Sequence, residues 1–177
     1  MPLTSPKHAR LHRKLLTVSE HLAMLGIAIL AGLAVYTVTD IILRLFSLSL
    51  PGTVDIVSYG LAIAIATIMP YGFLADQHIS ISAGIDRLAE KPRAILAALT
   101  KLISSIFLAW LAGSTFLYAA DRKEVHDTMW ILNIEIWPIW YVLAVLFIFT
   151  FFASLFQAWI AIDLALSTLT RQKVEKS

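Results

Sequence analysis

The sequence predicts an all-α integral membrane protein with four transmembrane helices. Of its 177 residues, 59% are hydrophobic and 15% are charged, whereas a soluble domain is usually about 45–50% apolar and about 25% charged. The apolar residues gather in runs of about twenty or more, the length that crosses a bilayer core of about 30 Å as a helix. These runs and their short links occupy nearly the whole chain, so we expect residues 1–177 to form a single four-helix membrane domain.

The first span is expected at residues 22–46. A positive stretch before an apolar run also resembles a signal peptide, but this run is long for such a signal and continues past any small-residue cleavage site. We therefore interpret it as an uncleaved span. Residues 10–20 carry a partly apolar face, which fits either an interfacial helix on the membrane surface or a disordered basic tail.

Two features of span one indicate helix packing. Ala28 and Gly32 lie one helical turn apart, and such small-residue faces let a second helix approach closely. Asp40 and Arg44 lie four residues apart, a spacing that favours an ion pair on one helix face. Because ionisable groups at membrane depth usually face protein or water, the pair is expected either against a partner or at the membrane interface.

The second span is expected at residues 54–75. Asp55 opens it, and an acidic side chain suits the positive end of the helix dipole. Gly60 and Ala64 form a second small-residue face, and Pro70 is expected to bend the helix near its end.

The link at residues 76–93 alternates loosely between apolar and polar residues, so a second interfacial helix is one option there. It contains His78, which by composition alone is a surface histidine at a helix end. The third span is expected at residues 95–120, with small residues four apart: Ser105, Ala109 and Gly113.

The most charged loop precedes the fourth span, which is expected at residues 136–161. Tryptophans are common at the headgroup level of membranes, and several cluster beside this loop. The loop and its neighbourhood contain Asp121, Arg122, Asp127, Trp130, Trp137 and Trp140.

Basic residues gather at both termini and in the link between spans two and three. The two other loops carry only Arg122 and Lys123, with Arg44 at a boundary. The positive-inside rule therefore predicts that both termini are cytoplasmic. A net charge of +2 gives no indication of nucleic-acid binding.

Catalytic and cofactor motifs are absent from the sequence. There is no cysteine, and no HExxH, GxSxG or phosphate-loop pattern. A four-helix membrane cytochrome would need histidines facing each other inside the bundle, whereas these lie in the N-terminal tail, at span ends or in loops. A self-sufficient transporter would usually show inverted repeats and helices broken near the midplane. We expect no enzyme activity, cofactor or metal site, and interpret the chain as a membrane subunit that packs against a larger partner.

Four local patterns carry a family resemblance. Arg44-Leu45-Phe46 ends span one, Asp55 opens span two, and His78-Ile79 follows it. Before span four stand Leu132, Ile134 and Trp137. With the chain length and the four spans, these patterns resemble the DctQ-like small membrane subunit of tripartite ATP-independent periplasmic (TRAP) transporters.

The chain departs from the family pattern in three places. Leu74, Ala75 and Asp76 stand where the family often has a basic residue and a glycine before the histidine. Ser82 stands where an acid is common, and Thr53-Val54 where a tryptophan is common.

The resemblance implies a scaffold role in the bacterial inner membrane, against a large permease subunit that holds the substrate and sodium sites. It also implies a periplasmic binding protein that delivers an organic acid, such as a dicarboxylate or a sugar acid. Residues expected at the partner interface or in structural roles are Asp40, Arg44, Asp55, His78, Gly32 and Gly113, and those expected in periplasmic loop contacts are Asp121, Arg122 and Asp127. The alternative is an accessory four-span anchor of a redox or other membrane complex.

Overall fold

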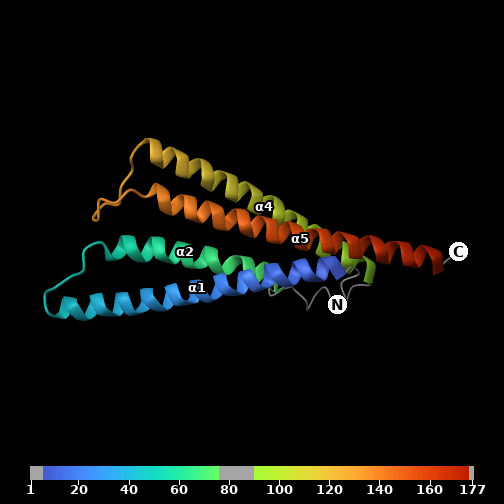
Figure 1. The fold of residues 1–177 in the computed structure, drawn as a ribbon, viewed down its shortest axis with the longest axis horizontal. Helices are drawn as coiled ribbons and strands as arrows, with labels where there is room; N and C mark the ends of the chain where they lie inside the picture. Colours follow the sequence, from blue (N-terminus) through green and yellow to red (C-terminus); the bar gives the residue numbers. More distant parts are fainter. Residues whose placement is uncertain (1–5, 76–89, 176–177) are drawn as a thin grey trace.

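Four long helices dominate the computed structural model, which describes residues 6–75 and 90–175 (Figure 1). They are α1 (Pro6–Leu45), α2 (Thr53–Leu74), α4 (Glu90–Glu124) and α5 (Trp137–Glu175). Each contains a stretch long and apolar enough to cross a membrane: His12–Leu45, Thr53–Leu74, Ile95–Glu124 and Trp137–Asp163. Within the described ranges the only β-type pairing is an isolated bridge between Thr128 and Glu135. The predicted all-helical membrane fold is confirmed.

Helix α1 is longer than the first predicted span. It begins at Pro6 and runs without interruption through residues 10–20, where a separate interfacial helix had been one option. No glycine or proline stands between Pro6 and Gly26 to end the helix. The hydroxyls of Thr17 and Ser19 donate to the carbonyls one turn earlier, which satisfies these polar groups within the helix. Most of the second candidate interfacial helix, residues 76–89, lies outside the described residues.

The helices form two antiparallel hairpins, α1–α2 and α4–α5, which contact each other through α2 and α5 (Figure 1). The loops at residues 46–52 and 125–136 lie at one end of the bundle, which we call the loop end. The starts of α1 and α4 and the ends of α2 and α5 lie at the other, which we call the terminal end.

The first hairpin relies on glycine. A Cβ added to Gly26 of α1 would lie 2.8 Å from the Ala64 carbonyl oxygen and 2.7 Å from Ile68 Cγ1. Gly60 of α2 faces Leu33 of α1, whose Cδ2 would lie 2.8 Å from an added Cβ. Close backbone approach is a main source of helix association in lipid, where apolar side chains gain little by leaving the hydrocarbon.

The second hairpin buries small and hydroxylated residues on α4 and α5. Ser105, Thr115, Thr150 and Ser154 are buried, together with alanines such as Ala112 and Ala144. The Thr115 and Thr150 hydroxyls donate to carbonyls of their own helices, so their burial leaves no donor unsatisfied. Toward the loop end the contact becomes aromatic, with Tyr118 edge-on to Trp140 at 4.6 Å between ring centroids.

Candidate partner interface

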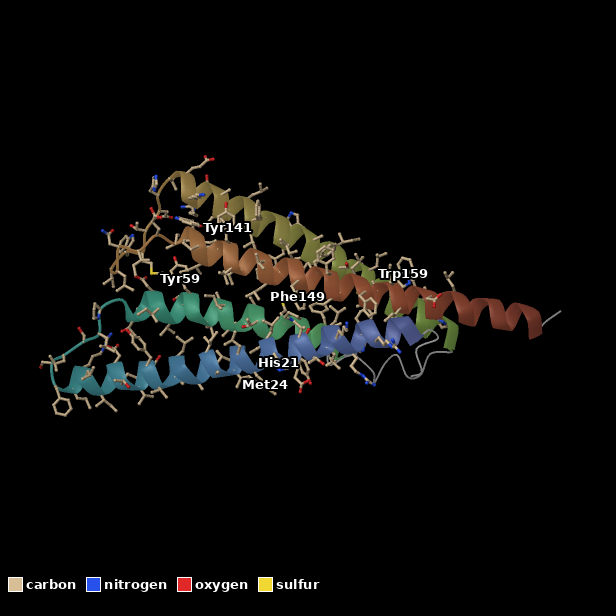
Figure 2. All side chains as sticks on the ribbon, viewed as in Figure 1. His21, Met24, Tyr59, Tyr141, Phe149 and Trp159 are labelled. Carbon is tan, nitrogen blue, oxygen red and sulfur yellow. The ribbon has the colours of Figure 1, made fainter. Side chains whose placement is uncertain are left out.

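Polar side chains concentrate at the two ends of the bundle, while the outer faces of the helices are apolar (Figure 2). Figure 2 shows Tyr59 and Tyr141 toward the loop end and Trp159 toward the terminal end. Among the residues that the structure describes, no group of three or more His, Asp or Glu side chains is placed to hold a metal ion.

Asp40 fastens the first loop to the end of α1. Its side chain is nearly inaccessible, with the residue 3% exposed, and accepts hydrogen bonds from Arg44 Nε at 2.9 Å and from the Leu50 backbone N–H at 2.9 Å. Arg44 also forms the predicted ion pair, with 2.8 Å between Nη2 and the Asp40 carboxylate. The Arg44 side chain is 58% exposed. One carboxylate therefore both orients an outward-facing cation and holds the loop of residues 46–52.

The first and second loops contact each other beside the start of α2. Gly52 has a left-handed φ of 73°, and an added Cβ would lie 2.5 Å from Leu132 Cγ in the second loop. Asp55, in the first turn of α2, accepts a long hydrogen bond of 3.4 Å from the Ile131 backbone N–H. Asp55 thus joins the first turn of α2 to the second loop, as well as being the acid that opens the second span.

Charged side chains at the end of α4 and in the second loop bind each other. Arg122 Nη1 donates to Asp127 at 2.8 Å, and the guanidinium lies over the Tyr118 ring at 4.6 Å from its centroid. Asp121 is farther from Arg122, at 3.5 Å, and its side chain is 61% exposed. Of the three predicted loop contacts, Arg122 and Asp127 bind each other, and Asp121 presents the most exposed charge.

Glu135 forms a second cluster in the same loop. Its carboxylate accepts hydrogen bonds from Trp137 Nε1 and from His126 Nδ1, the latter at 3.1 Å. The hydrogen bond from Trp137, followed by that from His126, lowers the pKa of Glu135 below its usual value of 4.5. Lys123 lies over the Trp137 ring at 5.2 Å from its centroid. These side chains line an open hollow at the loop end.

Gln157 joins all four helices near the terminal end. It lies in α5, is 7% exposed, and donates to the Leu74 carbonyl at the end of α2 at 3.1 Å. Its side chain also lies 3.4 Å from Lys101 Nζ of α4 and 3.4 Å from His12 Nε2 of α1. The last carbonyls of a helix lack partners within that helix, so Gln157 satisfies one that would otherwise be costly to bury.

The predicted small-residue faces divide into buried and open parts. Nothing lies within 4 Å of a Cβ added to Gly32 or Gly113, and Ala28 and Ala109 are exposed. Ser105, by contrast, is buried against α5. Only 11–28% of the most apolar stretch of each span is buried inside the chain. Much of the outer surface of the membrane spans is therefore available for contact with lipid or with another protein.

Sequence reasoning missed two important contacts. Gly26 was not singled out, although a glycine in a long apolar run is a signal for close packing. Gln157 was also missed, although a polar side chain in an apolar span usually faces protein. His78 lies outside the described residues.

Comparison with known proteins identifies the family. Residues 33–165 match the DctQ component of the tripartite ATP-independent periplasmic transporters, which covers more than half of the chain. The comparisons with curated proteins and with solved structures gave no match. The match begins at Leu33, next to the open Gly32, and extends through all four helices to residue 165 of α5. The chain belongs to the DctQ family, the small membrane component of the TRAP transporters.

Proposed function

We propose that this chain is a non-catalytic scaffold subunit that packs its open membrane faces against a large permease subunit. The family supplies the context of a multi-component transporter. The observation that carries the scaffold role is that Gly32 and Gly113 have open space around them within the membrane spans. Glycines there allow close backbone approach, which a lipid-only surface does not require.

In this proposal the large subunit holds the substrate and sodium sites, and a periplasmic binding protein delivers an organic acid. The polar side chains described here are engaged in joining helices and loops, as Asp40, Gln157 and Arg122 illustrate. Such groups stabilise the arrangement of the bundle, which suits a static element against which a second subunit moves.

We place the protein in the bacterial inner membrane, with the terminal end in the cytoplasm and the loop end in the periplasm. The basic residues near both termini and in the link after α2 support this orientation. Reporter fusions after Ser49 and Glu124 should then show periplasmic activity, whereas a fusion at the C-terminus should not. A periplasmic C-terminus would reverse the orientation.

The exposed charges of the loop end are proposed contacts for the binding protein. Asp121 is the leading candidate, because Arg122 and Asp127 are largely occupied with each other. Charges at the rim of a protein–protein interface mainly affect the association rate and its dependence on salt. Asp121→Asn should therefore change the dependence of uptake on binding-protein concentration while leaving assembly with the large subunit intact.

Reconstitution tests the scaffold role. Liposomes would contain this chain alone, the large subunit alone, or both, with binding protein outside and a sodium gradient. Uptake should require both membrane subunits. Uptake by this chain alone, or full uptake by the large subunit without it, would contradict the proposal. A haem absorbance band in the purified chain would instead favour a redox anchor.

A further inference from the structure

The tip of the second loop presents apolar side chains away from the bundle. Trp130 is 98% exposed, Ile131 is 59% exposed and Ile134 is 55% exposed. We call these three residues the apolar tip. A fully exposed tryptophan beside two exposed isoleucines is unfavourable in water, since each apolar side chain gains free energy when removed from water.

The loop backbone holds the apolar tip in this position. Met129 donates its N–H to the Ile134 carbonyl at 2.9 Å, and Asn133 donates to the Met129 carbonyl at 3.0 Å. Met129 itself is buried, at 8% exposed. Trp130 and Ile131 therefore lie between anchored residues, and their exposure results from a hydrogen-bonded turn.

Contacts to α2 set the level of the apolar tip relative to the membrane. The Ile131 N–H contacts Asp55, and Leu132 packs on Gly52, so the tip lies beside the first turn of a membrane span. In Figure 1 the loop between α4 and α5 reaches the start of α2, and the turn after α1 extends farther along the long axis. The tip is thus level with the end of a candidate membrane span.

Exposed apolar residues also surround the end of α1 at the same end of the bundle. Leu45 is 79% exposed, Phe46 is 72% exposed and Leu48 is 60% exposed. Exposed apolar side chains are therefore present at the loop end of both hairpins.

We propose that the apolar tip inserts into the boundary between headgroups and acyl chains of the leaflet at the loop end. Tryptophan favours this zone because its ring is largely apolar and its indole N–H can still bond to water or headgroups. The insertion anchors the second loop to the membrane independently of the large subunit. It rests on the membrane fold alone and does not depend on the scaffold role.

Site-directed spin labelling tests this insertion, because the chain has no native cysteine. Trp130→Cys would carry the label in liposomes of zwitterionic and anionic phospholipid, with and without the large subunit. Ser49→Cys, on an exposed position of the first loop, is the aqueous control, and Phe152→Cys, on an exposed position of α5, is the lipid control. The label at 130 should collide more with oxygen than with a water-soluble nickel complex, at a depth between those of the two controls.

Two results would overturn the proposal. One is a label at 130 that is as accessible to the nickel complex as the label at 49. The other is a label that is aqueous in the chain alone and becomes shielded only when the large subunit is added, since a protein would then be the occupant.

A label-free measurement provides an independent readout. The fluorescence of Trp130 is obtained as the difference between the native chain and Trp130→Phe, because four other tryptophans remain. Lipids brominated near the glycerol end of their acyl chains should quench this difference, and iodide should not. Quenching by iodide without quenching by brominated lipid would contradict the insertion.

Discussion

Gly26 and Gly32 lie on the same helix, yet they have opposite environments. A side chain at Gly26 would meet the backbone oxygen of Ala64 at 2.8 Å, whereas nothing lies within 4 Å of a Cβ at Gly32. Six residues of an α-helix correspond to a rotation of about 240° after full turns are removed, so the two glycines face different sides of α1. One face of α1 completes the hairpin, and another is left for lipid or a partner.

The second hairpin shows the same division. Ser105 is 2% exposed against α5, while Gly113 faces open space. Residues spaced by four drift about 40° per step around a helix, so Ser105 and Gly113 lie about 80° apart. The row of small residues at four-residue spacing therefore begins on the buried face of α4 at Ser105 and reaches an exposed face at Gly113. Buried small residues such as Ser105 stabilise the fold of this subunit, whereas exposed ones such as Gly113 are available for contact with another protein.

The largest effect is expected for Gly26→Leu. Overpacking typically costs about 1–3 kcal/mol, and here the obstacle includes a backbone carbonyl that side-chain rotation cannot relieve. The variant should show a markedly lower thermal unfolding midpoint in detergent. Gly32→Leu is the matched control and should stay within about 0.5 kcal/mol of the native chain, as is usual for exposed positions. Equal losses in both variants would remove the contrast between the two faces.

Asp40→Ala should be the next most damaging change. It removes the acceptor for the partly buried Leu50 N–H and leaves Arg44 without its partner, for an expected cost of about 1–3 kcal/mol. Asp40→Asn retains an oxygen for Leu50 and should cost less. Unfolding midpoints of the purified chain measure both.

The charge swap refines this prediction. Asp40→Arg combined with Arg44→Asp restores the ion pair but supplies no acceptor at position 40 for Leu50. We expect at most partial recovery of stability. Full recovery would show that the loop contact contributes nothing and that the pair acts through its charges alone.

A smaller effect is expected for Gln157→Leu. The change removes the donor to the Leu74 carbonyl, and interhelical hydrogen bonds in membrane proteins are worth about 0.6–1.7 kcal/mol. Hydrogen exchange should rise in the last turn of α2 and stay unchanged in its first turn. Gln157→Glu keeps an acceptor near Lys101 but lacks the donor to Leu74, so its exchange pattern should match that of Gln157→Leu. Protection equal to that of the native chain in both variants would show that the hydrogen bond from Gln157 does not stabilise the end of α2.

The smallest effect is expected when Glu135 becomes protonated at acidic pH. The folded-state pKa of Glu135 is depressed, so its contribution is fully present above its usual value of 4.5 and is lost as the pH falls through the lower folded value. Protonation weakens its hydrogen bonds from Trp137 and His126, and tryptophan fluorescence should change in that acidic range. Glu135→Gln should abolish this component. An unchanged profile in the variant would show that Glu135 is not the group responsible for the transition.

The sequence was sufficient to predict the four helices, their order and the Asp40–Arg44 pair. These features depend on run length and on contacts within one helix, which spacing reveals. The Leu50 N–H bound to Asp40, Leu132 on Gly52 and Gln157 on the Leu74 carbonyl could not be predicted. They join residues far apart in the chain, and the helix rotations that bring them together depend on packing. The sequence left residues 10–20 open between an interfacial helix and a disordered tail, because a partly apolar basic segment fits both, whereas the structure shows a helix continuous with span one.

Association with the large permease subunit tests the central claim most directly. Tagged chains carrying Gly32→Leu or Gly113→Leu would be co-expressed with the large subunit and purified in mild detergent, beside the control Val38→Leu at another exposed position of α1. The scaffold account predicts that at least one glycine variant loses most of the large subunit while the isolated variant keeps the native unfolding midpoint, and that the control retains it. Native recovery of the large subunit with both glycine variants would contradict the account, because neither open small-residue face would then be its contact.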